Sequence, residues 1–100
     1  MITHTVSFTL VHEPDSAGES AFIRAARDTI SAIPGVRDFT INRQISRQSN
    51  FRFQFTMRFT DQAAYDSYNA HPDHQEFVAT NWTREVSRFE ELDFVPYAVP

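Results

Sequence analysis

The chain has 100 residues, so we expect one domain spanning residues 1–100. Its net charge of −4 gives no sign of a nucleic-acid partner or of a polyphosphate ligand. It contains no cysteine, and its nine basic residues are all arginines, which excludes disulfides, thiolate metal ligands, cysteine nucleophiles and lysine Schiff bases.

The N-terminal segment alternates apolar and polar residues, which predicts a strand over residues 1–11. One face of this strand carries Ile2, His4, Val6, Phe8 and Leu10, and hydroxyl side chains occupy the other face. The segment has no continuous apolar run and is therefore not a signal peptide, and no other run reaches membrane-spanning length. We expect a cytoplasmic protein with no membrane partner.

A helix is predicted next, because Ser16-Ala17-Gly18-Glu19 has the pattern of a capping box. In this motif Ser16 caps the helix and Glu19 reaches back. Apolar residues then recur with a 3.6-residue period until Pro34-Gly35 ends the helix. The residues predicted to be buried are Phe22, Ala25, Ala26, Thr29, Ile30 and Ile33.

Two strands follow, over residues 36–43 and 51–59. The first is predicted to point Phe39 and Ile41 inward, and the second shows the strongest strand pattern in the chain. Its apolar face carries Phe51, Phe53, Phe55, Met57 and Phe59. Such a stripe usually forms a core, although aromatic side chains also line apolar ligand pockets.

The second helical region is predicted to break at Pro72. Thr60 caps a helix beginning at Asp61, and this helix ends near Ala70 because proline lacks a backbone N–H and disfavours helical angles at the residue before it. A second piece, with Asp73 at its cap or in its first turn, continues to about Trp82.

The last predicted strand covers residues 88–97, with Leu92 and Phe94 on one face and Glu91 and Asp93 on the other. The order strand, helix, strand, strand, helix, strand predicts an α+β, ferredoxin-like βαββαβ fold: a four-stranded antiparallel sheet with helices on one face. The helices are expected to cover the phenylalanine-rich face.

The opposite face is expected to be polar. Its predicted members are Thr3, Thr5, Ser7, Thr9, Arg52, Gln54, Thr56, Arg58, Glu91 and Asp93. Two interpretations stay open at this point. The face can be solvated, as is common for antiparallel sheets, or it can meet a second copy to form a closed barrel. The arginines and carboxylates can pair within this face or across it, or remain solvated.

The helix break also gathers the residues that look suited to chemistry. Tyr68 is predicted on the inward face of the first helical piece, and His74, with Phe77, Val78 and Trp82, on that of the second. His74 can act as a general base near neutral pH, and the Tyr68 phenol can steady an enolate. The alternative is that the two side chains form a satisfied polar pair with no catalytic role.

The other polar side chains near the break receive structural interpretations. His4 can be a core histidine bonded to a helix carbonyl or to Tyr68, His71 is expected to be exposed and to cap a helix end, and Tyr65 is expected to face outward without a role. His71 and His74 are three residues apart, but the proline between them spoils the helical spacing that metal ligation uses. We therefore expect neither a metal nor a cofactor.

The chain resembles the stress-responsive A/B barrel (Dabb) family. The matching motifs are Ile2-Thr3-His4, Ile33-Pro34-Gly35-Val36, Tyr68-Asn69-Ala70-His71-Pro72-Asp73-His74 and Asp93-Phe94. The resemblance implies a dimeric α+β barrel and hence a homodimer formed through the polar sheet face.

One branch of that family resembles plant olivetolic acid cyclase, which closes a linear polyketide by aldol condensation. That resemblance implies that His74 and Tyr68 are the acid–base pair and that His4 lies in the pocket. Two positions differ: a strand histidine of that branch is Phe53 here, and a helix tyrosine is Ala26. The pocket is expected to be more apolar, with more space, and to include His4, Phe22, Ala26, Phe53, Phe77 and Trp82.

Three functions remain open from the sequence. The chain can bind an apolar small molecule without catalysis, or it can be a cofactor-independent polyketide cyclase or aldolase-type enzyme that uses His74 and Tyr68. It can also be a cofactor-independent monooxygenase of the wider dimeric α+β barrel group, which shares the fold but lacks the His-Pro-x-His run.

Overall fold

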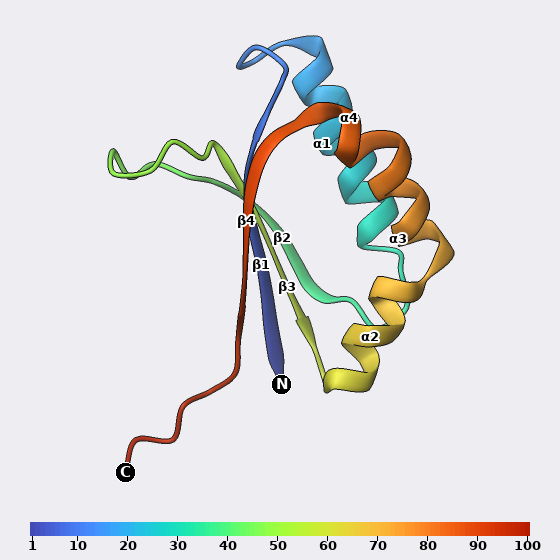
Figure 1. Ribbon diagram of the computed structural model, residues 1–100, viewed down its shortest axis with the longest axis vertical. Helices are drawn as coiled ribbons and strands as arrows, with labels where there is room; N and C mark the ends of the chain where they lie inside the picture. The colour runs from blue at the N-terminus through green and yellow to red at the C-terminus, as the bar shows by residue number, and fades with distance from the viewer.

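The chain folds into a four-stranded antiparallel sheet, and its helices cover one side of that sheet (Figure 1). The structure, a computed structural model, describes residues 1–100, and the strand order is β2-β3-β1-β4. The predicted ferredoxin-like arrangement is confirmed. Its elements are β1 (Ile2–Leu10), α1 (Ala17–Ile30), β2 (Arg37–Arg43), β3 (Phe53–Phe59), α2 (Gln62–Ala70), α3 (Pro72–Phe77), the π-helical turn η1 (Val78–Trp82), α4 (Thr83–Glu85) and β4 (Val86–Phe94).

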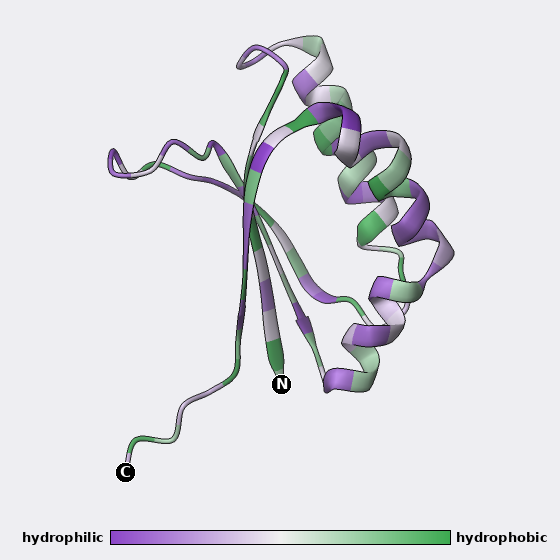
Figure 2. Ribbon diagram, in the orientation of Figure 1, coloured by the Kyte–Doolittle hydropathy of each residue, from purple (hydrophilic) through white to green (hydrophobic).

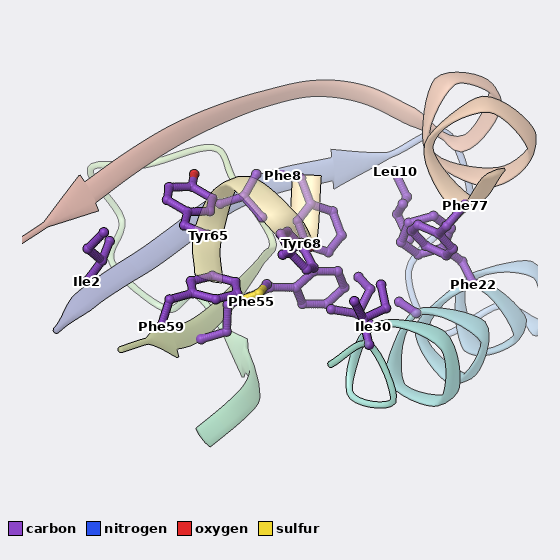
Figure 3. Close-up of a cluster of buried hydrophobic side chains, with 14 residues drawn as sticks. Ile2, Phe8, Leu10, Phe22, Ile30, Phe55, Phe59, Tyr65, Tyr68 and Phe77 are labelled. Atoms are coloured by element: carbon purple, nitrogen blue, oxygen red, sulfur yellow. The ribbon is translucent and has the colours of Figure 1, made fainter. Parts of the chain in front are cut away.

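The side of the sheet that the helices cover, called the inner face below, holds the hydrophobic core. Paired residues of an antiparallel ladder lie on the same face, and the β1–β3 register places Val6 opposite Phe55 and Phe8 opposite Phe53. Figure 2 shows apolar and polar residues following one another along the strands. The largest fully buried side chains are Phe8, Phe22, Phe55, Met57 and Phe59, and they cluster between the sheet and the helices (Figure 3).

The start of α1 differs from the predicted capping box in one bond. Ser16 accepts a hydrogen bond from the Glu19 N–H at 3.2 Å, as expected, but Glu19 accepts from the Asp15 N–H at 2.9 Å. The Glu19 carboxylate also accepts two hydrogen bonds from Arg52, at 2.7 and 3.1 Å. Arg52 was expected on the polar face; regular strand pairing begins only at Phe53, so Arg52 is free to reach the buried carboxylate of α1.

The predicted helix break is present, and a side chain caps the N-terminus of each of the two helices that meet there. Asp61, one residue later than predicted, caps α2 by accepting from the Ala64 N–H at 2.9 Å. His71 has extended backbone angles (φ −65°, ψ 135°), and its Nδ1 accepts from the Asp73 N–H at 3.1 Å. Pro72 is the first residue of α3, where a missing N–H costs nothing. The break therefore turns the chain sharply and still satisfies its helix ends.

The strand β4 is the main correction to the predicted fold. Its register pairs Val6 with Glu91 and His4 with Asp93, which puts both carboxylates on the inner face. Leu92 and Phe94 instead lie on the other, open face of the sheet, and they are 50% and 52% exposed. The prediction assigned the carboxylates to the open face because it followed polarity, whereas β4 is an edge strand whose inner side borders a cavity.

The C-terminal residues after β4 carry further apolar side chains. Val95, Tyr97 and Val99 are all exposed, and this segment extends away from the sheet and helices (Figure 1). Arg58, also assigned to the open face, pairs with Asp38 at 3.7 Å and not with a β4 carboxylate. None of the helices is both long and apolar enough to cross a membrane.

Candidate functional site

A cavity of about 240 Å³ lies between the inner face of the sheet and the helical region around the break. Its apolar wall includes Val6, Ile30, Phe55, Met57, Phe77, Val78, Trp82 and Phe89, and its polar residues are His4, Tyr68, Asn69, His74 and Glu91. A dry cavity of roughly 150 Å³ is sufficient to hold benzene. This cavity is therefore large enough for a molecule with one aromatic ring and a short side chain.

His74 is the third residue of α3, and its ring lies against Tyr68. The two ring centroids are 4.4 Å apart. The His74 Nδ1 lies 3.3 Å from the Asn69 carbonyl oxygen, and because a carbonyl only accepts, Nδ1 carries the proton. Burial lowers the pKa of His74, and the hydrogen bond to Asn69 offsets this only in part. At neutral pH the ring is therefore uncharged, with an unprotonated Nε2 available as a base.

Tyr68 brings an unusual hydroxyl to the cavity. The residue is 3% exposed, yet its hydroxyl makes no hydrogen bond within the chain and borders the cavity. Burial, and then the negative charge of Glu91, raise the pKa of the Tyr68 phenol well above its ordinary range. The phenol therefore keeps its proton and can donate one hydrogen bond to whatever fills the cavity. No buried side-chain polar atom of the chain lacks a partner, so the Tyr68 hydroxyl oxygen reaches the space of the cavity and is open to a ligand acceptor.

His4 enters the same cavity from β1, held by two partners. Its Nδ1 lies 2.6 Å from Asp93 Oδ1, and the Tyr65 hydroxyl lies 2.8 Å from the same nitrogen and donates to Asp93 Oδ2 at 2.9 Å. Figure 3 shows the Tyr65 phenol oxygen pointing toward β4. When Nδ1 carries the proton and donates it to the Asp93 carboxylate, Nε2 is the unprotonated nitrogen of the neutral His4 ring. These hydrogen bonds hold the His4 ring in place. The predicted partner was a helix carbonyl or Tyr68, whereas the observed partners are Asp93 and Tyr65.

The structure brings five of the eight predicted site residues to the cavity: His4, Tyr68, His74, Phe77 and Trp82. Phe22, Ala26 and Phe53 do not line it. Phe22 packs against Phe77 and Trp82, with ring centroids 5.7 and 6.2 Å apart, and α1 reaches the cavity wall only through Ile30. Ala26 is fully buried beside Phe22 in the core, and the Phe53 ring packs on Phe8 farther along the sheet.

Three residues important to the site were missed or misplaced by the sequence reasoning. Tyr65 was expected to face outward, but it is 8% exposed, stacks on Phe59 and bonds to His4 and Asp93. Its position three residues before Tyr68 on the same helix was the available signal. Asp93 and Glu91 share the parity of Phe89, which also lines the cavity, and this parity could have placed them on the inner face.

No group of three or more histidine, aspartate or glutamate side chains is arranged to hold a metal ion. His71, the nearest histidine in sequence to His74, is engaged as a helix cap by its Nδ1. The polar side chains of the cavity include one phenol donor without a partner in the chain, one neutral imidazole, one carboxylate-bound imidazole and one carboxylate.

Comparison with known proteins supports the fold and places the chain in a family. The solved structure of a Dabb family protein with a ferredoxin-like fold from Mesorhizobium loti is 48% identical, with a TM-score of 0.96 over 97% of each chain. A dimeric ferredoxin-like protein of unknown function from Thermobifida fusca is 19% identical, with a TM-score of 0.75 over 95% of this chain and 90% of that one.

A hydroxynitrile lyase from Passiflora edulis is also similar in fold, at 12% identity, with a TM-score of 0.83 over 99% of this chain and 96% of that one. At such identity the likeness shows a shared fold and nothing about activity. No curated protein sequence matches the chain. The sequence model of the Stress responsive A/B Barrel Domain matches residues 2–96, and the chain therefore belongs to the Dabb family.

Proposed function

We propose that the chain binds a small, mostly apolar molecule that carries a carbonyl or hydroxyl oxygen. The observation that carries this proposal is the Tyr68 hydroxyl, which is protonated, makes no hydrogen bond within the chain and opens into a cavity walled by apolar side chains. A pocket of this kind, with few polar groups converging on one point, is typical of small-molecule sites. The ligand oxygen accepts from Tyr68 and its apolar body contacts Phe55, Met57 and Trp82.

A second candidate, proton-transfer catalysis, is favoured by the orientation of His74. Its Nδ1 is tied to the Asn69 carbonyl, so Nε2 is the basic nitrogen, and its lowered pKa keeps that nitrogen free at neutral pH. A base and a hydrogen-bond donor side by side are the minimum for forming an enolate.

In this candidate reaction the base is the His74 Nε2. Nε2 takes a proton from the carbon beside a carbonyl, so a C–H bond breaks, an N–H bond forms, and the electron pair moves to the carbonyl oxygen, where Tyr68 donates its hydrogen bond. The enolate carbon can then attack a second carbonyl of the same molecule, and the imidazolium returns its proton to the new alkoxide. This is the aldol closure implied by the family resemblance, and here it rests on His74 and Tyr68.

One probe separates binding from catalysis. We would incubate the protein in D₂O with 4-phenylbutan-2-one, follow exchange of the protons beside the carbonyl by NMR, and measure binding by the fluorescence of Trp82, the only tryptophan. Binding without accelerated exchange supports the binding function alone. Accelerated exchange that falls by about 10²–10⁴ in Tyr68→Phe and His74→Gln supports catalysis. Absence of saturable binding contradicts both.

Matched controls exist for both variants. Tyr97→Phe removes a phenol that is 81% exposed, and His71→Asn removes an imidazole but keeps an acceptor suited to a helix cap. Neither control residue lines the cavity, so both should leave binding and exchange unchanged.

We also infer that two copies associate through the open face of the sheet. Leu92 and Phe94 are half-exposed on that face, and three exposed apolar residues follow in the C-terminal segment. Structural neighbours from Thermobifida fusca, Bacteroides fragilis and a Jannaschia species are dimeric. A stable pair needs roughly 800 Å² buried per partner, which a sheet face with an apolar tail can supply.

Light scattering at micromolar concentration tests this association. The wild type should be a dimer, and Phe94→Arg should shift it toward monomer because a charge would be buried at the contact. Ile45→Arg makes the same kind of change at a side chain that is 86% exposed in the β2–β3 loop, and it should leave the dimer intact. A wild-type monomer would contradict the inference.

A further inference from the structure

We propose that Glu91 selects ligands by charge, so that the cavity accepts neutral and cationic molecules and rejects carboxylates, phosphates and sulfonates. This inference rests on the proposed small-molecule site and specifies its substrate class. Glu91 lies opposite Val6 in the β1–β4 register, on the inner face, and lines the cavity while its residue stays exposed. Because Glu91 is exposed and also lines the cavity, it lies where the cavity opens to solvent.

The Glu91 carboxylate has no compensating cation. It takes part in none of the ion pairs of the structure. Arg27, Arg52 and Arg58 pair with other carboxylates. No arginine lines the cavity, and the chain contains no lysine. A ligand anion would therefore find no group of opposite charge in the cavity to replace its lost hydration.

The two imidazoles of the cavity do not supply a net positive charge either. Burial lowers the pKa of His74, which keeps that ring neutral at physiological pH. His4 lies 2.6 Å from Asp93, so a protonated His4 is balanced by that carboxylate, and a neutral His4 leaves Asp93 as a second negative charge behind the cavity. In both protonation states of His4 the cavity is neutral or negative before Glu91 is counted.

The field of Glu91 already acts on the neighbouring groups. After burial, the charge of Glu91 is the other cause of the raised pKa of Tyr68, and it also contributes to the raised pKa of Tyr65. Both effects disfavour a negative charge at the polar end of the cavity. A ligand carboxylate placed near Tyr68 would experience the same repulsion, and an ammonium group the reverse. For charges several ångströms apart at a partly solvated opening, the repulsion should weaken the binding of a carboxylate by about tenfold at low salt.

Three probes with one carbon skeleton measure the charge preference: 3-phenylpropan-1-ol, 3-phenylpropanoate and 3-phenylpropylammonium. Each is titrated at pH 7.5 and low ionic strength into the full chain, with Trp82 fluorescence as the readout because this single tryptophan lines the cavity. The test variant is Glu91→Gln. The control is Glu76→Gln, which removes the same charge from an exposed residue of α3 outside the cavity. Thermal unfolding verifies that both variants fold.

The wild type should bind the carboxylate about tenfold more weakly than the alcohol. It should bind the ammonium at least as tightly as the alcohol. Glu91→Gln should remove most of this difference, measured as the ratio of the alcohol and carboxylate affinities of each variant, whereas Glu76→Gln should keep the wild-type ratio. Equal affinities in the wild type, or a preference that survives Glu91→Gln, would overturn the role of Glu91 and leave the proposed binding site standing. If none of the three probes binds, the binding site itself fails and the charge preference with it.

Discussion

The two ends of β1 support different kinds of packing on the same inner face. Near its C-terminal end, the Phe8 ring lies 4.6 Å from Phe55 and 5.1 Å from Trp82 between centroids, in a nearly water-free aromatic cluster. Near its N-terminal end, His4 bonds to Asp93 and Tyr65 beside the unpaired Tyr68 hydroxyl. The first end is closed by apolar contact, and the second is closed by hydrogen bonds that leave one donor and one base unused.

This difference shows where stability and function separate in the molecule. At the aromatic end, Phe8 is fully buried and does not line the cavity, so changing it should affect folding. At the polar end, Tyr65 is satisfied and Tyr68 is not, although both are buried tyrosines one helical turn apart. The pair offers a direct comparison of a structural phenol with a ligand-facing one.

The largest expected effect is that of Phe8→Ala at the aromatic end. Phe8 is fully buried, so the substitution should lower the free energy of unfolding by about 3–5 kcal/mol through lost burial and the cavity left behind. Denaturant unfolding measures this change. A loss below about 1 kcal/mol would mean that the aromatic cluster does not anchor the fold.

Tyr65→Phe should have an intermediate effect. It removes the hydroxyl that contacts His4 at 2.8 Å and donates to the half-exposed Asp93 at 2.9 Å, so we expect a loss of about 1–3 kcal/mol in the free energy of unfolding. The exposed Tyr97→Phe is the matched control and should change nothing measurable. If both variants unfold alike, Tyr65 does not stabilise the network.

The effect of pH should be smaller and have a defined sign. Because burial lowers the pKa of His74, the unfolded chain binds more protons than the folded one just below the ordinary imidazole pKa of about 6.5. The contribution of His74 to stability is therefore present above that value and is lost as the pH falls through the folded pKa. Relative to His74→Gln, the wild type should lose stability between pH 7.5 and pH 5. NMR titration should place the His74 midpoint below 6.5, and a midpoint above it would contradict the buried, neutral base.

Sequence pattern was sufficient for the fold and for the local chemistry of the helix break. The alternation of β1 and β3, the 3.6-residue period of α1 and the proline at residue 72 are local signals, and each produced the predicted element, although α1 ends at Ile30 and not at the predicted stop of Pro34-Gly35. His71 caps α3 as expected because the constraint came from its own neighbour in sequence.

What the sequence could not provide was the partner of each polar side chain. Asp93 and His4 are 89 residues apart in the chain, so their contact depends on the β1–β4 register, which no local pattern specifies. The rule that apolar residues face the core misplaced Glu91 and Asp93, because the inner side of an edge strand borders a cavity there. Arg52 was misplaced because its carboxylate partner lies on α1.

The most direct test of the account uses Tyr68→Phe, with the affinity for 3-phenylpropan-1-ol and the free energy of unfolding measured on the same preparation. Since the Tyr68 hydroxyl has no partner in the chain and one in the ligand, we expect affinity to fall about tenfold while stability changes by less than about 0.5 kcal/mol. Unchanged affinity, or a loss of stability as large as that of Tyr65→Phe, would contradict the claim that this phenol faces a ligand.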